Sequence, residues 1–321
     1  MGVGTNLLGY GRKEVDKAVH EAINKGNMSS LNCKEEVLLA EKLVSMHPWS
    51  SKAKFARTGG EANAMAIRIA RSYTKKDNIA VCGYHGWHDW YLSANLNNKK
   101  NDQLKNHLLP GLGSSGVLKS MKNSVHTFEY NNINQLLKII KKKNIGTIFM
   151  EVSRSISPKN NFLDKVRDLA NKNKIVLIFD ECSSGFRETF GGLHLKYNIN
   201  PDICMFGKAL GNGYAITSII GVEKIMSYAS KSFISSTFWS ERIGYVAALS
   251  TLKTMEKNKS WEYVTDFGKK IKRAWSDLAR KHGLLIEIYG LDALPSFSIN
   301  SPNFLKYKTY ITQEMLKKGF L

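Results

Sequence analysis

Short, continuous apolar runs alternate along most of the chain with longer stretches in which apolar residues recur every three or four positions. Continuous runs are typical of strands buried on both faces of a parallel sheet, and the three-to-four period is typical of helices with one apolar face. Strands and helices that alternate in this order predict a mostly parallel sheet with helices on both faces. The expected fold class is therefore α/β.

Apolar runs predict strands at residues 53–58, 79–82, 125–128, 145–152, 175–179, 203–206 and 216–222. Helical periodicity predicts helices at residues 12–25, 35–46, 61–73, 131–143, 161–172, 223–229 and 241–256. Towards the C-terminus, residues 261–282 and 307–318 predict helices, and residues 284–289 and 296–300 predict strands. Residues 95–122 are polar and rich in Gly and Ser, and a loop of this length is usually functional or mobile.

Two of the predicted strands end on residues that can carry chemistry. Residues 175–179 are followed by Asp180, and residues 203–206 are followed within two positions by Lys208. Ligands of open α/β sheets bind outside the carboxyl ends of the strands, so both side chains are expected at a ligand site. The alternative is an ion pair between neighbouring strand ends. Three glycines around the lysine, Gly207, Gly211 and Gly213, favour a ligand, because an ion pair does not need closely approaching backbone.

A lysine facing a buried carboxylate suits pyridoxal phosphate, which needs an amine for its Schiff base and an anion against its ring nitrogen. The motifs Phe179-Asp180-Glu181 and Gly207-Lys208-Ala209-Leu210-Gly211 resemble those of the class III aminotransferases of fold type I. Within this family, glutamate-1-semialdehyde aminomutase-like proteins have the most similar pattern. The resemblance covers nearly the whole chain, and it implies that Lys208 and Asp180 are catalytic.

A turn between a predicted strand and helix, Thr58-Gly59-Gly60, offers an anion site. Free backbone N–H groups and the positive end of the helix dipole meet there, although many such turns carry glycines for steric reasons alone. The turn resembles the family's Ser-Gly-Thr-Glu-Ala phosphate turn, which implies that the N–H groups of Gly59 and Gly60 bind the cofactor phosphate. Gly60 replaces the usual threonine, so one hydroxyl contact is missing.

The resemblance implies further cofactor contacts. Tyr84 of the Tyr84-His85-Gly86 motif would stack on one face of the cofactor ring, and Cys182 would pack on the other face. Glu151 matches an acid near the site, and Thr237 matches a threonine that reaches the cofactor phosphate of the partner subunit, which implies a homodimer. The residues expected at the cofactor are therefore Gly59, Gly60, Tyr84, His85, Glu151, Asp180, Cys182, Lys208 and Thr237.

Composition changes this interpretation little. The formal net charge of +20 raises the alternative of nucleic-acid binding, but the lysines are spread along the chain and indicate a solvated basic surface. The four cysteines lack metal-ligand spacing, and His85, His88 and Asp89 have no distant fourth ligand, so no metal is expected. The expected free thiols and the lack of a secretory signal favour a cytoplasmic protein. No apolar run is long enough to predict a membrane segment.

The expected reaction moves an amino group from an amino acid donor to a ketone or aldehyde acceptor, such as a sugar derivative. Aromatic residues are dense around the predicted site, and flat aromatic surface suits an apolar or sugar-like face. These residues are Trp87, Trp90, Tyr91, Phe238 and Trp239, and the motifs that contain them resemble relatives associated with surface-polysaccharide amino sugars. The alternative is an aromatic core cluster, which is expected to include some of these rings, such as Trp90.

Other functions remain open at this stage. One is glutamate-1-semialdehyde 2,1-aminomutase, and another is a decarboxylase or racemase with the same cofactor residues. A third is a truncated protein that binds the cofactor without catalysis. Relatives extend beyond both ends of the chain, so we expect a fragment in which residues 1–250 form the central cofactor domain and residues 251–321 form an incomplete C-terminal domain.

Overall fold

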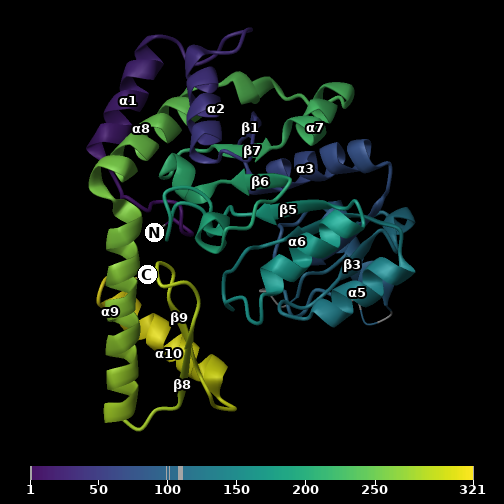
Figure 1. Ribbon diagram of the computed structural model, residues 1–321. Coiled ribbons are helices and arrows are strands. Elements are labelled where there is room, and N and C mark those ends of the chain that lie inside the picture. The colour runs from purple at the N-terminus through teal and green to yellow at the C-terminus, as the bar shows by residue number, and fades with distance from the viewer. Residues whose placement is uncertain (1, 99, 101, 108–110, 321) are drawn as a thin grey trace.

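The computed structural model describes all residues except 1, 99, 101, 108–110 and 321. Its centre is a seven-stranded sheet in the order β1-β7-β6-β5-β4-β2-β3 (Figure 1). The strands are β1 (Lys52–Ala56), β2 (Asn78–Cys82), β3 (Val125–Thr127), β4 (Ile145–Met150), β5 (Val176–Asp180), β6 (Ile203–Phe206) and β7 (Thr217–Gly221). Every residue of β4, β5, β6 and β7 is buried, as continuous apolar runs predict.

Strands β3, β2, β4, β5 and β6 are parallel, which confirms the mostly parallel sheet. Strand β7 is antiparallel to both of its neighbours, β6 and β1. Parallel strands need a crossover of a dozen or more residues, and the connection from Phe206 to Thr217 is shorter and contains no α-helix. The chain therefore turns back through the segment that carries Lys208.

Helices cover both faces of the sheet and bury two separate apolar clusters. One cluster includes α3 (Gly59–Thr74) and α7 (Glu223–Met226), with residues such as Met65 and Met205. The other cluster includes α2 (Lys34–Met46), α5 (Ile133–Lys142), α6 (Phe162–Lys172) and α8 (Arg242–Asn258). Helix α1 (Lys13–Asn24) packs on α8 through Val15, Val19 and Ala247, and α4 (Asp89–Leu92) is a single turn. Helices on both faces are as expected.

The C-terminal elements lie apart from the central sheet (Figure 1). They are the long helix α9 (Ser260–Lys281), the hairpin of β8 (Ile286–Tyr289) and β9 (Ser296–Ile299), and α10 (Phe304–Lys317). The hairpin contacts the loop after β4, where the N–H of Leu291 donates to the carbonyl of Arg154 at 3.2 Å. These elements bury few residues, and α10 buries none.

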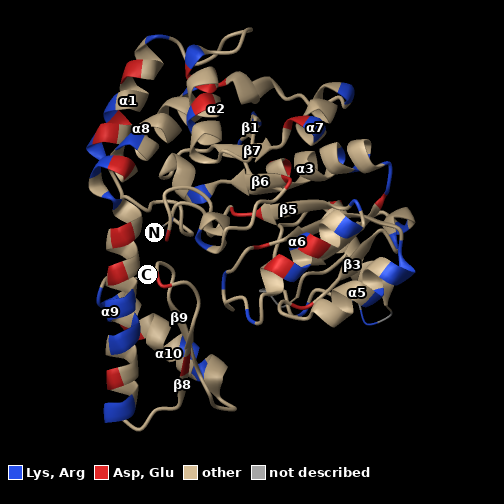
Figure 2. Cartoon of the chain, in the orientation of Figure 1, with Lys and Arg blue, Asp and Glu red and all other residues tan. Residues whose placement is uncertain are grey.

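The polar stretch 95–122 includes the short 3-10 helix Lys119–Met121 and the end of another, Ser93–Asn97, and its residues 99, 101 and 108–110 lie outside the described residues. Lysine and arginine residues are distributed over helices and loops throughout the fold (Figure 2). Within the described chain, none of the helices combines the length and the apolar character needed to cross a membrane.

Candidate active site

Asp180 and Lys208 lie at the same edge of the sheet, as the sequence predicts. Asp180 is the last residue of β5, and Lys208 follows the neighbouring parallel strand β6 after Gly207. Lys208 has a left-handed φ of 42°, which is strained for a residue with a side chain. A Cβ atom on Gly207 would lie 3.0 Å from Cγ2 of Thr217, so a side chain there would be tightly packed against the start of β7.

The amine of Lys208 donates to Ser183 Oγ at 2.6 Å. Burial lowers the pKa of Lys208, and the positive charge of Arg154 lowers it further, although Cys182 and Asp180 act in the opposite sense. A lysine with a lowered pKa is more often neutral and therefore nucleophilic. The sequence analysis did not identify Ser183, because a serine in the turn after β5 has no distinguishing pattern.

The Asp180 carboxylate accepts three hydrogen bonds. His85 Nδ1 lies 2.9 Å and Asn63 Nδ2 lies 3.1 Å from Oδ2, and the N–H of Cys182 donates to Oδ1 at 3.1 Å. Burial alone would raise the pKa of Asp180, but the hydrogen bond and charge of His85 lower it below its usual value. The carboxylate is therefore held as an anion, and the buried His85 fixes its orientation.

Asn63 was also missed in the sequence analysis. It lies on α3 four residues after Gly59, and therefore on the same face of the helix as the start of the predicted phosphate turn. That spacing is a signal that could have identified it. The side chain also donates to the carbonyl of His85 at 3.1 Å, so one amide ties the Tyr84-His85-Gly86 motif to Asp180.

The turn before α3 is fixed by a capping box between Thr58 and Glu61. Thr58 Oγ1 accepts from the N–H of Glu61, and the N–H of Thr58 donates to the Glu61 carboxylate at 2.9 Å. The N–H groups of Gly59 and Gly60 lie in the first helical turn, where no intrahelical acceptor exists. A Cβ atom on Gly59 would lie 3.5 Å from Sγ of Cys182, which places the turn next to the residue two positions after Asp180.

Glu151 and Tyr84 lie beside this site. The N–H of Tyr84 donates to Glu151 Oε2 at 3.2 Å, and Arg154 Nη1 lies 3.4 Å from Oε1. Burial raises the pKa of Glu151 despite the nearby arginine. Desolvation likewise raises the pKa of the Cys182 thiol well above its ordinary value, so Cys182 is a small uncharged group.

The remaining predicted residues lie elsewhere on the chain surface or in the core. Thr237 is exposed, in a short 3-10 helix (Thr237–Ser240) whose carbonyls accept hydrogen bonds from Arg57. Trp90 and Tyr91 belong to the apolar cluster under α3, so these two of the five aromatic rings are core. Trp87 is 72% exposed and Phe238 is 65% exposed.

A cavity of about 330 Å³ adjoins Glu151. Its polar lining includes Asn106, His107, Glu129, Tyr130, Ser153, Arg154 and Ser155. His107 Nδ1 lies 2.9 Å from the carbonyl of Gly83, and burial lowers the pKa of His107 to about 4, so the ring is neutral at pH 7. The cavity therefore presents one cationic side chain, Arg154, among hydroxyl, amide and carboxyl groups and the apolar side chains of Cys82, Phe128 and Ile156.

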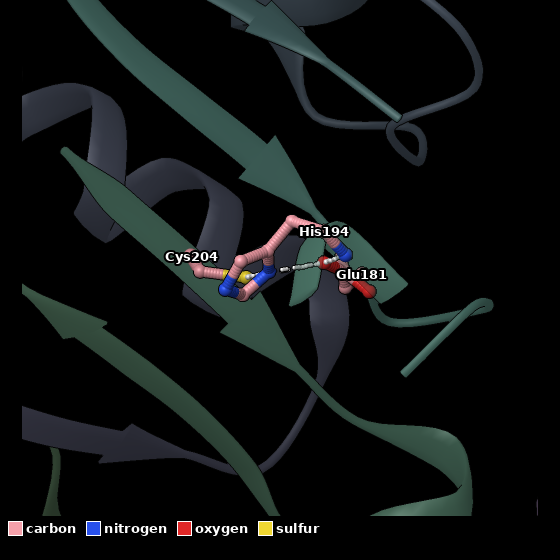
Figure 3. Close-up of side chains that lie close together, drawn as sticks. All are labelled: Glu181, His194 and Cys204. Carbon is pink, nitrogen blue, oxygen red and sulfur yellow. Dashed lines mark hydrogen bonds and ion pairs between the residues drawn. The ribbon is translucent and has the colours of Figure 1, made fainter. Parts of the chain in front are cut away.

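A second buried cluster contains Glu181, His194 and Cys204 (Figure 3). His194 Nδ1 lies 2.6 Å from Glu181 Oε1, and Trp49 Nε1 donates to His194 Nε2 at 2.9 Å. Because both ring nitrogens are engaged by protein groups, this cluster is a hydrogen-bond network rather than a metal centre. It fixes the turn that contains Leu193 to the end of β5, next to Asp180.

The residues at the carboxyl edge fit pyridoxal phosphate. The buried Asp180 anion matches a protonated ring nitrogen, the Lys208 amine matches an aldehyde, and the α3 N-terminus matches a phosphate. The glycines at 59 and 207 leave space on either side of Cys182 where a Cβ atom would otherwise stand.

Comparison with known proteins agrees with this fit. The model of the family described as aminotransferase class-III matches residues 2–321. The chain is 32% identical over 320 residues to 3-aminobutyryl-CoA aminotransferase of Cloacimonas acidaminovorans, covering 97% of this chain and 73% of that protein. It is 34% identical over 296 residues to glutamate-1-semialdehyde 2,1-aminomutase of Nitrosopumilus maritimus, and the match covers 88% of this chain and 68% of that protein.

Solved structures have the same fold. The pyridoxal-phosphate internal aldimine form of the Sphingopyxis sp. MTA144 FumI protein has a TM-score of 0.82 at 24% identity, covering 94% of this chain and 70% of that one. Taurine:2-oxoglutarate aminotransferase from Bifidobacterium kashiwanohense, in complex with PLP and glutamate, has a TM-score of 0.80 at 18% identity. The match covers 99% of this chain and 79% of that one. The fold is that of the fold type I pyridoxal-phosphate enzymes, and the chain belongs to the class III aminotransferase family.

Proposed function

We propose that the protein transfers an amino group through pyridoxal phosphate, with Lys208 as the amine and proton carrier and Asp180 opposite the ring nitrogen. One observation carries this proposal. A lysine and a carboxylate meet at the ends of adjacent strands, and the pKa of the lysine is lowered, while the carboxylate is anionic and accepts three hydrogen bonds. The bound cofactor supplies an aldehyde that bonds to amines and a ring that withdraws electrons from the substrate carbon.

The contacts of this chain's residues suggest the role that each would have once the cofactor is bound. Asp180 would keep a proton on the ring nitrogen, because its own pKa is lowered. Lys208 Nζ would take a proton from the substrate carbon and deliver it to the exocyclic carbon of the cofactor, and Ser183 Oγ would orient that amine. The N–H groups of Gly59 and Gly60 would bind the phosphate, Tyr84 and Cys182 would lie beside the ring, and Glu151 fixes the backbone at Tyr84.

We assign the cavity beside Glu151 to the amino acceptor. Its hydroxyl, amide and carboxyl groups suit a ketone or aldehyde that carries hydroxyl groups, such as a sugar derivative, and Arg154 suits an anionic substituent of the same molecule or of the amino acid donor. The polar lining supports this choice better than the aromatic residues do, since two of those residues are core.

We further propose a cytoplasmic homodimer in which Thr237 completes the phosphate site of the partner subunit. The exposed position of Thr237 and the four free cysteines support this arrangement. Residues 1–250 would hold the cofactor, and residues 251–321 would contribute to the mouth of the site, since Leu291 contacts the carbonyl of Arg154.

The test is to add pyridoxal phosphate, reduce with borohydride and locate the label by mass spectrometry. We expect one modified residue, Lys208, and no stable label in Lys208→Ala. Lys141→Ala, which removes an exposed lysine of α5, is the matched control and should label normally. A label on another lysine, or none, would contradict the assignment.

A second candidate function is the internal amino shift of glutamate-1-semialdehyde, because a 34% identical relative carries that name. The two functions differ in their need for a separate amino donor. Giving the protein glutamate-1-semialdehyde without any other amine decides between them, since rapid formation of 5-aminolevulinate would establish the aminomutase.

A further inference from the structure

The imidazole of His88 occupies the space beside Gly60, at the start of α3. A Cβ atom on Gly60 would lie 2.6 Å from His88 Nδ1, closer than real Cβ atoms approach other atoms. The φ of Gly60 is not in the left-handed region, so glycine is required there for space and not for backbone conformation. Any larger side chain at position 60 therefore competes with the His88 ring for the same volume.

His88 Nδ1 is buried, and within the described chain it has no hydrogen-bond partner. Buried polar atoms in native proteins nearly always have a partner, so a ligand or water is expected at this nitrogen. The ring also packs against Trp87, with 4.7 Å between the ring centroids. The unpaired nitrogen is thus held next to the first turn of α3.

The turn itself offers only backbone donors to an anion. The Thr58 hydroxyl accepts from the N–H of Glu61 and lies 3.2 Å from its carboxylate, so it is already engaged in the capping box. Gly60 has no side chain. The N–H groups of Gly59 and Gly60 at the positive end of a 16-residue helix therefore form a phosphate site to which the turn itself contributes no side-chain donor.

We propose that His88 supplies this donor, with Nδ1–H hydrogen-bonded to the cofactor phosphate. The inference rests on the placement of the phosphate at Gly59 and Gly60 in the proposed function. The imidazole stands where a side-chain hydroxyl at position 60 would otherwise reach the same anion. Gly60 and His88 are therefore one exchangeable pair, and replacing both residues together should restore a donor.

The experiment compares the Kd of pyridoxal phosphate with that of pyridoxal, which lacks the phosphate, by spectroscopic titration. His88→Ala should raise the Kd of pyridoxal phosphate by about 10-fold to 100-fold, which is the usual effect of losing a hydrogen bond to a charged group. Pyridoxal binding should change less than about twofold, because it has no phosphate to lose. His88→Gln, which keeps an N–H donor, should recover part of the loss.

The decisive variant is the double substitution Gly60→Thr with His88→Ala, in which a threonine hydroxyl enters the vacated space. Its affinity for pyridoxal phosphate should exceed that of His88→Ala alone. His126→Ala, which removes another imidazole with a buried unpaired nitrogen on edge strand β3, is the control and should bind both compounds normally. Circular dichroism of each apo-protein confirms that the variants are folded.

Two outcomes would overturn the inference. If His88→Ala weakens the binding of pyridoxal phosphate and of pyridoxal equally, His88 only packs against the turn. If the double variant binds pyridoxal phosphate no more tightly than His88→Ala does, the position-60 side chain does not reach the phosphate. Failure of the proposed function is a separate result, because it would appear in the unmodified protein as the absence of a covalent bond at Lys208.

Discussion

At the scale of single residues, the site depends on keeping two ionisable groups in unusual states close to each other. Asp180 remains an anion despite its burial because three donors face it. Lys208 loses part of its basicity because it is buried and faces Arg154. A buried carboxylate without partners would be costly in a low-dielectric environment, whereas burial favours the neutral form of the amine, so the site presents one anion beside one nucleophilic amine.

Asp180→Asn should lower kcat by about 100-fold or more, because the amide cannot hold a proton on the ring nitrogen by charge. Folding should change little, since the amide has nearly the same volume. Steady-state kinetics and thermal melts check both statements. Asp202→Asn, at the other end of β6, is the control, because Asp202 pairs with Arg167 away from the site. Near-normal turnover in Asp180→Asn would show that another group holds the ring nitrogen.

The rate at which pyridoxal phosphate bonds to the apo-protein should rise with pH around a midpoint below 10.5, the ordinary pKa of lysine. The sign follows from the direction of the shift, because a lowered pKa leaves the amine neutral at a lower pH. Arg154→Gln removes a positive charge near Lys208 and should move the midpoint to higher pH. Stopped-flow absorbance across a pH series measures it, and an unchanged midpoint in Arg154→Gln would contradict the electrostatic explanation.

At the scale of elements, the helix α3 joins the two halves of the site. Its first turn presents the N–H groups of Gly59 and Gly60, and its second turn presents Asn63 to Asp180. The capping box at Thr58 fixes the direction of this helix relative to β1. The phosphate turn and the carboxylate therefore move together as one rigid unit.

Thr58→Ala should lower the free energy of unfolding of the apo-protein by about 1 kcal/mol, the usual cost of losing an N-cap side chain. It should also weaken pyridoxal phosphate binding, because the turn that offers the N–H groups loses its anchor. Chemical denaturation and cofactor titration measure the two effects. Thr312→Ala in α10, whose hydroxyl bonds only back to the carbonyl of Lys308, is the control. Unchanged stability in Thr58→Ala would mean that the capping box is redundant.

The sequence predicted the elements well because their apolar patterns are strong, and the starts of β6 and β9 agree to the residue. It did not predict that β7 is antiparallel, because an apolar run carries no information on strand direction. The short connection after Phe206 was the available signal. Asp180 and Lys208 were predictable because they end strands. Ser183 was not, because its contact with Lys208 arises only when two loops are brought together.

At the scale of the whole molecule, the proposed homodimer assigns Thr237 to the phosphate site of the partner subunit. That residue is exposed on a segment anchored by Arg57, which bonds the carbonyls of Phe238 and Trp239. Trp87, next to His88, is also largely exposed beside the same site. In the proposed homodimer, a second copy of the chain would cover this exposed threonine and the exposed aromatic residue near the cofactor site.

A homodimer with shared sites predicts complementation between two defective chains. Lys208→Ala lacks the amine, and Thr237→Ala lacks the phosphate contact that its partner needs, so each homodimer should be inactive or weak at limiting cofactor. In a hybrid dimer, one site combines an intact Lys208 with the partner's intact Thr237. Mixing the chains after mild dissociation should restore about a quarter of wild-type activity, because about half of the dimers are hybrids with one intact site each.

The control for this experiment is Lys208→Ala mixed with Asp180→Asn. Both substitutions affect the part of the site that one chain supplies, so a hybrid dimer contains no intact site and mixing should restore nothing. Size-exclusion chromatography with light scattering measures the assembly in the same samples. An active monomer, or equal recovery in the control mixture, would show that Thr237 does not act across the subunit boundary. The phosphate would then depend on groups of a single chain, foremost the first turn of α3.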